Sequence, residues 1–221
     1  MGGQMTVRWL RAGIVLSFLP SVALAQSLAL NVEAGVSNAQ LVTPDNYWGS
    51  RFGWLVGASG SVNLTSWLAL QGGLRLHEKG AEGPGSFEMR LRYLEFPVLA
   101  RIALGPANWP LRPLIAFGLA PARELSCAER AVPPSIPEAP PPPARPEDCL
   151  SQRTDLWDSG LLAGVGGELR VGHFGMALTL QHVRGTHNIA SGYRGGYPIH
   201  NRATSVVLSA SLPVWHGRPS N

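Results

Sequence analysis

The chain has 221 residues, of which 14% are charged, and a formal net charge of +4. Soluble globular proteins carry about 25% charged residues, so this content is low for that class. The net charge is too small to predict a nucleic-acid partner, because such proteins neutralise backbone phosphates with many basic side chains.

The N-terminal segment, residues 1–25, has the pattern of a secretory signal peptide. Arg8 and Arg11 form a positive start, Ala12–Leu19 is a short apolar run, and Ala23–Ala25 is an A-x-A cleavage site. The apolar run is too short for a stable membrane-spanning helix. The sequence therefore predicts export, with a mature protein that begins at Gln26.

Eight later segments alternate apolar residues with polar or small ones, which is typical of strands and not of helices. In chain order these expected strands are Leu28–Asn38, Phe52–Leu64, Trp67–His77, Leu91–Leu104, Arg112–Arg123, Leu156–Arg170, Phe174–Arg184 and Ala203–Val214. Two folds of an exported protein fit them, a secreted β-sandwich and a transmembrane β-barrel.

The face of each segment that carries the polar or small residues favours the barrel. A sandwich would expose many charged and long side chains there, whereas these positions are mainly Gly, Ser and Ala with a few isolated charges. The narrow interior of a small barrel needs such residues. We therefore predict an all-β fold, an eight-stranded antiparallel up-and-down transmembrane β-barrel over residues 26–221.

The alternation also predicts which side chains face lipid and which face the lumen. In the fourth segment the lipid-facing set is Leu94, Phe96, Val98 and Ile102, opposite Tyr93, Glu95 and Arg101. The charges expected inside form a lumenal network of Arg75, Glu95, Arg101, Glu168 and Arg170. A polar conduction path is the alternative interpretation of these residues, although eight strands leave little more than room for side chains.

Connections between the segments alternate in length. Short ones are expected at Thr65-Ser66, Gly105–Leu111 and Gly172-His173, and long ones at Ala39–Arg51, Glu78–Arg90, Glu124–Asp155 and Gly185–Arg202. This alternation is typical of barrels with periplasmic turns and extracellular loops. It predicts the outer membrane of a Gram-negative bacterium, with both termini in the periplasm.

The longest expected loop, residues 125–154, contains the proline-rich stretch PPSIPEAPPPPARPEDC. Such a stretch cannot pair as a strand and favours polyproline II geometry. Cys127 and Cys149 are the only cysteines of the chain, and export makes a disulfide between them chemically permitted. No further ligands stand near them at metal-binding spacing, so we expect neither a metal nor a cofactor.

Several motifs resemble the PorT-like, or outer membrane protein beta-barrel domain, family. They are SWLALQGGLRLHEKG, LRYLEFPVLARI, RPLIAFGLAPARELSC, DSGLLAGVGGELR, LQHVRGTHNI and NRATSVVLSASL, in chain order. Three features depart from the family pattern: Gln181 stands where an arginine is frequent, the proline-rich insert has no counterpart, and HGRPSN follows Trp215 instead of a terminal aromatic residue. The resemblance implies fold and location more firmly than activity.

Catalytic residues are hard to find. His182, His187 and His200 lie near the last expected loop with Ser191 and Asp155, but no nucleophile elbow and no fixed spacing accompany them. We expect no catalysis and a structural or surface-interaction role for a monomer, with outer-membrane lipid, lipopolysaccharide and an extracellular ligand or envelope protein as partners. The alternatives are an accessory protein of secretion or envelope assembly and a lipid-modifying hydrolase.

Overall fold

The computed structural model describes residues 27–44, 48–83, 87–131, 156–172, 174–189 and 198–216. The signal peptide and the whole proline-rich stretch, residues 133–149, lie outside these ranges. No helix long and apolar enough to cross a membrane occurs in the described part.

Nine strand segments make up the described fold. They are β1 (Ser27–Val42), β2 (Arg51–Asn63), β3 (Leu68–Gly83), β4 (Phe87–Glu95), β5 (Val98–Ala103), β6 (Leu111–Ala131), β7 (Trp157–Val171), β8 (Phe174–Gly185) and β9 (His200–His216). The segments β4 and β5 are two parts of one strand that Phe96 and Pro97 interrupt, because both pair with β3 on one side and β6 on the other.

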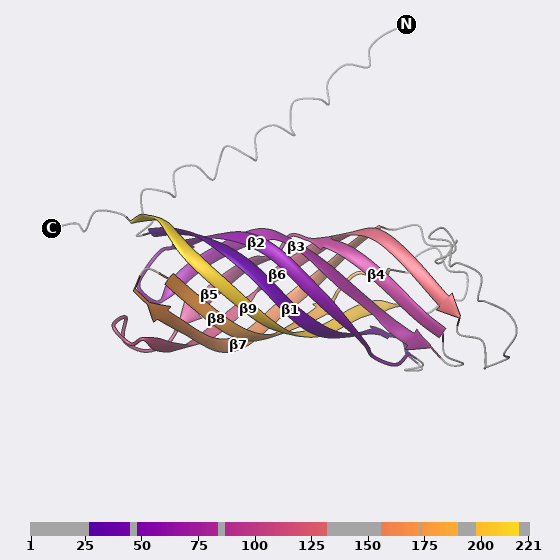
Figure 1. Ribbon diagram of the computed structural model, residues 1–221. Coiled ribbons are helices and arrows are strands. Elements are labelled where there is room, and N and C mark those ends of the chain that lie inside the picture. Colours follow the sequence, from indigo (N-terminus) through magenta and orange to yellow (C-terminus); the bar gives the residue numbers. More distant parts are fainter. Residues whose placement is uncertain are drawn as a thin grey trace, which may run out of the picture.

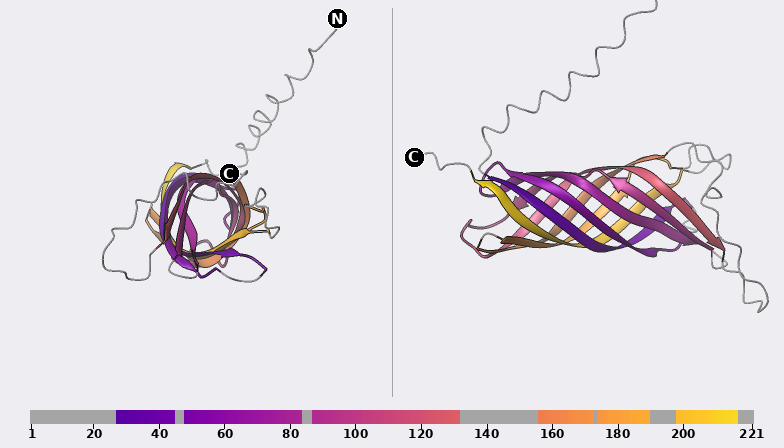
Figure 2. Two further views of the ribbon diagram at one scale, coloured as in Figure 1. Left: turned by 90° about the vertical axis from the view of Figure 1, so that its right-hand side faces the viewer. Right: turned by 45° about the horizontal axis from the view of Figure 1, so that its top comes forward.

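The strands close into a ring of eight antiparallel positions. Each strand pairs with its neighbours in the sequence, and β1 completes the ring by pairing with both β2 and β9. Viewed along its axis, the ribbon is a closed cylinder (Figure 2). The predicted eight-stranded antiparallel barrel is therefore confirmed.

Side chains alternate between the outside and the inside of the cylinder. Val98 is 59% exposed, whereas its neighbour Leu99 is 2% exposed. Tyr93 and Glu95 are completely buried inside. Most outward side chains in the middle of the strands are apolar, and this arrangement follows the alternation in the sequence.

The two ends of the barrel differ. The termini of the described chain and three short connections, after β2, β5 and β7, lie at one end, which we call the turn end (Figure 1). The opposite end, where the connections after β1, β3, β6 and β8 lie, is the loop end. Arg112 secures the turn end by donating hydrogen bonds to the carbonyls of Ser66 (2.8 Å) and Ala103 (2.7 Å).

At the loop end the strands are longer than the sequence predicted. The expected loop Glu78–Arg90 was wrong, because β3 runs on to Gly83 and pairs with β4 from Phe87. The prediction failed because HEKGAEG lacks apolar alternation, although Lys79 is buried inside the barrel. Similarly, β6 extends past the expected end at Arg123 to Ala131.

An apolar cluster fills the loop end of the interior. Leu41, Met89, Leu91, Tyr93 and Ile189 pack together there, each at most 1% exposed. The alternation predicted Tyr93 inside, but Leu41, Met89 and Ile189 were missed because they fell in segments interpreted as loops.

Candidate functional site

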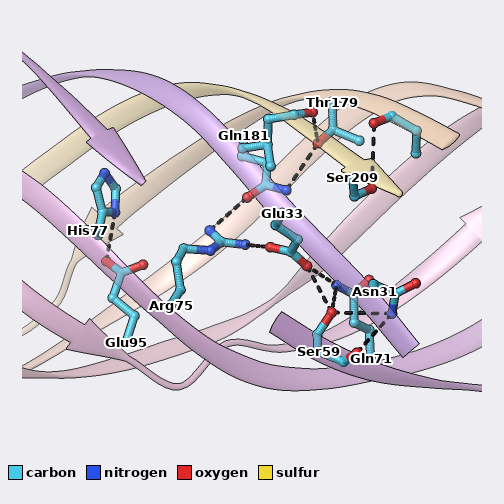
Figure 3. A network of polar contacts seen from close by, with 12 residues as sticks. Asn31, Glu33, Ser59, Gln71, Arg75, His77, Glu95, Thr179, Gln181 and Ser209 are labelled. Carbon is cyan, nitrogen blue, oxygen red and sulfur yellow. Dashed lines mark hydrogen bonds and ion pairs between the residues drawn. The ribbon is translucent and has the colours of Figure 1, made fainter. Parts of the chain in front are cut away.

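The centre of the lumen holds an ion pair between Glu33 on β1 and Arg75 on β3. Glu33 Oε2 lies 2.8 Å from Arg75 Nη2, and both side chains are buried. Glu33 Oε1 also accepts hydrogen bonds from Gln71 Nε2 (2.5 Å) and Ser59 Oγ (2.9 Å) (Figure 3). Gly57 stands between Glu33 and Arg75 in the register, and its missing side chain leaves room for theirs.

The same arginine reaches the opposite wall. Arg75 Nη1 donates to Gln181 Oε1 on β8 at 3.1 Å, and Gln181 Nε2 donates to Thr179 Oγ1 at 3.1 Å (Figure 3). In the ring of eight positions, β3 and β8 lie four positions apart, so this contact crosses the full diameter of the lumen. Gln181, which departs from the family's frequent arginine, accepts a hydrogen bond from an arginine across the barrel.

Glu95 forms a second buried charge centre toward the loop end. Lys79 Nζ lies 2.6 Å and His77 Nδ1 3.0 Å from Glu95 Oε1. The Lys79 ammonium also lies 5.1 Å from the centre of the Tyr93 ring, which is a cation–π contact. Sequence reasoning missed Lys79 because its segment was interpreted as a loop, and it placed His77 inside without assigning it a role.

A further contact joins opposite walls next to this centre. Asn201 Nδ2 on β9 donates to the Tyr93 hydroxyl on β4 at 3.0 Å and to Asp158 Oδ2 on β7 at 2.7 Å. All three side chains are buried. Because β4 and β9 also lie four positions apart in the ring, this bond crosses the lumen at a second level.

Toward the turn end the interior opens into a polar cavity of about 200 Å³. Arg101 on β5 lines it, donates to Gln71 Oε1 (3.1 Å) and lies 3.5 Å from Glu168 on β7. Glu168 in turn pairs with Arg170 at 2.6 Å, where Arg170 is exposed at the rim. Asn31, Ser61 and Ser209 line the same cavity.

Four of the five predicted lumenal charges are connected, because Gln71 and Glu33 link Arg101 to Arg75, whereas Glu95 bonds to Lys79 and His77. Arg75 and Glu95 are Cα partners in the β3–β4 register, yet their short ion pairs are to Glu33 and to Lys79. Arg101, Glu168 and Arg170 form the turn-end part of this network, and Gln71 joins it to the central pair. Glu33 was missed as Lys79 was, although its place on the small-residue face of β1 could have identified it.

A last group of charges lies at the loop end. Arg51 on β2 pairs with Glu78 on β3 at 2.9 Å and with Glu88 on β4 at 2.6 Å. Arg92 lies 3.4 Å from Glu78, and Arg90 lies 3.0 Å from Glu88. These pairs tie the ends of three neighbouring strands together.

The histidines considered for a hydrolytic site lie on β8 and near the loop end. His182 is exposed on the outside of β8, where its Nδ1 lies 2.9 Å from Thr204 Oγ1, and His200 Nδ1 lies 2.9 Å from the carbonyl of His187. Ser191 and Asp155 lie outside the described residues. Within the described ranges, no group of three His, Cys, Asp or Glu side chains could hold a metal ion.

The cysteines are only partly described. Cys127 is buried in β6, beside Leu91 in the register. Cys149 lies outside the described residues, so the disulfide stays a prediction.

Residues 24–191 match the family described as outer membrane protein beta-barrel domain. The chain belongs to this family. No curated protein matches the sequence. The closed barrel and its mainly apolar outside agree with this family. The chain is therefore a small bacterial outer-membrane protein whose strands cross the bilayer and whose outside contacts lipid.

Solved structures of other outer-membrane proteins are similar to this chain at low sequence identity. Neisserial surface protein A (NspA) has the same fold and aligns with a TM-score of 0.50 and 10% identity over 83% of this chain and 97% of its own. OprG from Pseudomonas aeruginosa aligns with a TM-score of 0.45 and 9% identity over 87% and 98% of the two chains. Ail from Yersinia pestis aligns with a TM-score of 0.42 and 9% identity over 85% and 99%.

Proposed function

We propose that this outer-membrane protein is a closed, non-conducting and non-catalytic barrel that anchors a set of surface loops for contact with an extracellular ligand or another envelope protein. In this proposal the loop end faces the cell exterior, both termini lie in the periplasm, and the barrel works as a monomer surrounded by lipid and lipopolysaccharide.

The observation that carries the proposal is the pair of contacts across the lumen. The Arg75–Gln181 bond and the Tyr93–Asn201 bond each join walls that lie four positions apart in the ring. Side chains at two levels therefore occupy the path that an ion or solute would take. An eight-stranded barrel has an interior just wide enough for side chains, so little space is left around them.

The distribution of the connecting segments supports a role at the loop end. The turn end has only short links, such as the two residues between β7 and β8, and these offer little surface to a periplasmic assembly. This is the reason to prefer surface interaction over an accessory role in secretion. The proline-rich segment 125–154 begins in β6 at the loop end and gives that end the largest segment available for binding.

Single-channel recording on the purified, refolded protein in planar bilayers tests the closed lumen. We expect no unitary current steps from the wild type. The matched variant Gln181→Gly with Asn201→Gly removes the far-wall partner of each bridge without removing a charge, and we expect it to leak. Regular current steps from the wild type would contradict the proposal.

An epitope tag inserted between Ala139 and Pro140 tests the orientation. Antibody added to intact cells is expected to bind this tag, and a second tag placed after Asn221 is expected to bind only after the outer membrane is permeabilised. The reverse pattern would place the loop end in the periplasm. If a strain whose protein lacks the surface loops still bound every surface partner of the wild type, the proposed role of the loops in surface contact would be contradicted.

A further inference from the structure

The outside of the barrel changes from apolar to basic near the loop end. On β8 the outward positions Phe174, Met176, Leu178 and Leu180 are exposed and apolar, and His182 and then Arg184 follow toward the loop end. The same change occurs on three other strands, where the exposed outward arginines are Arg202 on β9, Arg123 on β6 and Arg92 on β4. We call these four arginines, together with exposed Trp157 on β7, the arginine belt.

The register shows that the belt runs across five neighbouring strands. Arg184 is the Cα partner of Arg202, and Arg123 is the Cα partner of Trp157. Arg92 lies two residues from Leu94, which is the Cα partner of Arg123. The order β9, β8, β7, β6 and β4 is also the order of these strands in the sheet, so the belt is continuous along one side of the wall.

The positive charges of the belt are poorly neutralised by the protein itself. Within the described ranges, Arg123, Arg184 and Arg202 take part in no salt bridge, whereas Arg92 has a contact of 3.4 Å with Glu78. Like charges directly opposite each other on neighbouring strands destabilise a sheet. The Arg184–Arg202 pair has this arrangement on the outward face, and an anion between the two guanidinium groups would relieve the repulsion.

The belt lies at one edge of the apolar band only. The outward positions at the turn end include Leu28, Leu111, Val171 and Val214, which are exposed and apolar. From Phe174 to Arg184 the strand rises about 25 Å along the barrel axis at the usual strand tilt, which matches the apolar band of outer-membrane barrels. The arginines therefore lie at the headgroup level of a single leaflet.

We propose that the arginine belt binds the phosphate groups of lipopolysaccharide in the outer leaflet, with Arg184 and Arg202 sharing one phosphate. Guanidinium groups match phosphate oxygens with paired, charge-assisted hydrogen bonds. Trp157, whose indole suits the boundary between acyl chains and headgroups, lies between Arg123 and the Arg184–Arg202 pair. This site rests on the proposed orientation, in which the loop end faces outward.

Lipid retention measured by native mass spectrometry tests the belt. The folded protein is placed in nanodiscs that contain lipid A, its dephosphorylated form or phosphatidylglycerol, and the affinity for each is determined. We expect the wild type to prefer lipid A over both. Removing one arginine near a charged lipid surface weakens binding about fivefold, so Arg184→Gln with Arg202→Gln is expected to weaken lipid A binding about 25-fold.

Arg90→Gln is the matched control, because Arg90 is also exposed near the loop end but is already paired with Glu88. We expect this variant to bind lipid A like the wild type, and gel mobility to show that all variants are folded. Equal binding of lipid A and its dephosphorylated form, or unchanged binding by the folded double variant, would overturn the proposal. A preference for phosphatidylglycerol would overturn it as well, since the belt would then suit the inner leaflet. Conductance does not enter these readouts, so a conducting barrel that still selects lipid A would refute only the closed lumen.

Discussion

Arg75 and Gln181 are 106 residues apart in the sequence and bond across the diameter of the barrel, with Arg75 Nη1 donating to Gln181 Oε1 at 3.1 Å. Through its other terminal nitrogen Arg75 pairs with Glu33, so one guanidinium connects three strands of the wall. The centre of the lumen is thus held together by polar contacts.

Breaking the central pair should be costly. Arg75→Met leaves the Glu33 carboxylate buried without its cation, and removing one partner of a buried ion pair costs about 3–5 kcal/mol of the free energy of unfolding. Denaturant unfolding in phospholipid bilayers measures the loss. The double variant Glu33→Gln with Arg75→Met removes both charges and should recover much of the stability. If the stability losses of the two single substitutions simply add in the double variant, the pairing of Glu33 with Arg75 is contradicted.

The lipid-facing side can be tested at Val98, which is 59% exposed in the apolar band. Val98→Arg should cost about 2–4 kcal/mol of unfolding free energy if the position lies near the bilayer midplane. Ser126→Arg is the control, because Ser126 is exposed near the loop end of β6, opposite Arg92 of the belt in the register, and should cost about 0–1 kcal/mol. Spin labels at these positions should report lipid for Val98 and water for Ser126. Equal costs would mean that the membrane boundary is misplaced.

The β3 backbone has a constraint at Gly80, whose φ is +147°. A Cβ added there would collide with the carbonyl of Met89 on β4, so Gly80→Ala should destabilise the barrel by about 1–3 kcal/mol. Gly60→Ala is the control, since a Cβ at Gly60 meets nothing within 4 Å. Comparison of the two unfolding midpoints checks this expectation. Equal midpoints would show that β3 adapts without strain.

A disulfide between Cys127 and Cys149 is expected to restrain the proline-rich segment and not the barrel. Closing a loop of this length stabilises it by about 3 kcal/mol in the entropic model. Reduction should therefore increase proteolysis between Pro133 and Pro146 while the folded barrel keeps its mobility on gels. Two titratable thiols in the unreduced protein would exclude the bond. Loss of the folded form on reduction would instead give the bond a role in the barrel.

The mature protein is expected to start at Gln26, because Ala23–Ala25 matches the cleavage pattern of a signal peptide. N-terminal sequencing of the protein from outer-membrane fractions measures this directly. An intact Met1 on the membrane-bound protein would contradict the predicted cleavage.

The barrel could be predicted from the chain alone, because the two environments of its wall impose a period of two on every strand. The alternation that placed Val98 outside and Glu95 inside is local, and it needs no knowledge of neighbouring strands. The exact strand ends were not predictable in this way. Near Gly80 the strand continues through charged residues, and its pairing with β4, not apolar periodicity, keeps it extended.

The contacts between polar side chains, in contrast, depend on how the strands are assembled. The sequence placed Arg75 and Glu95 inside, but their partners Glu33 and Lys79 depend on the stagger between strands, which no single strand encodes. The Arg184–Arg202 pair arises in the same way, since two arginines on separate strands become neighbours only through the β8–β9 register. Whether a side chain faces the lumen or the lipid is determined within its own strand. Which polar side chains bond to one another depends on the closed ring.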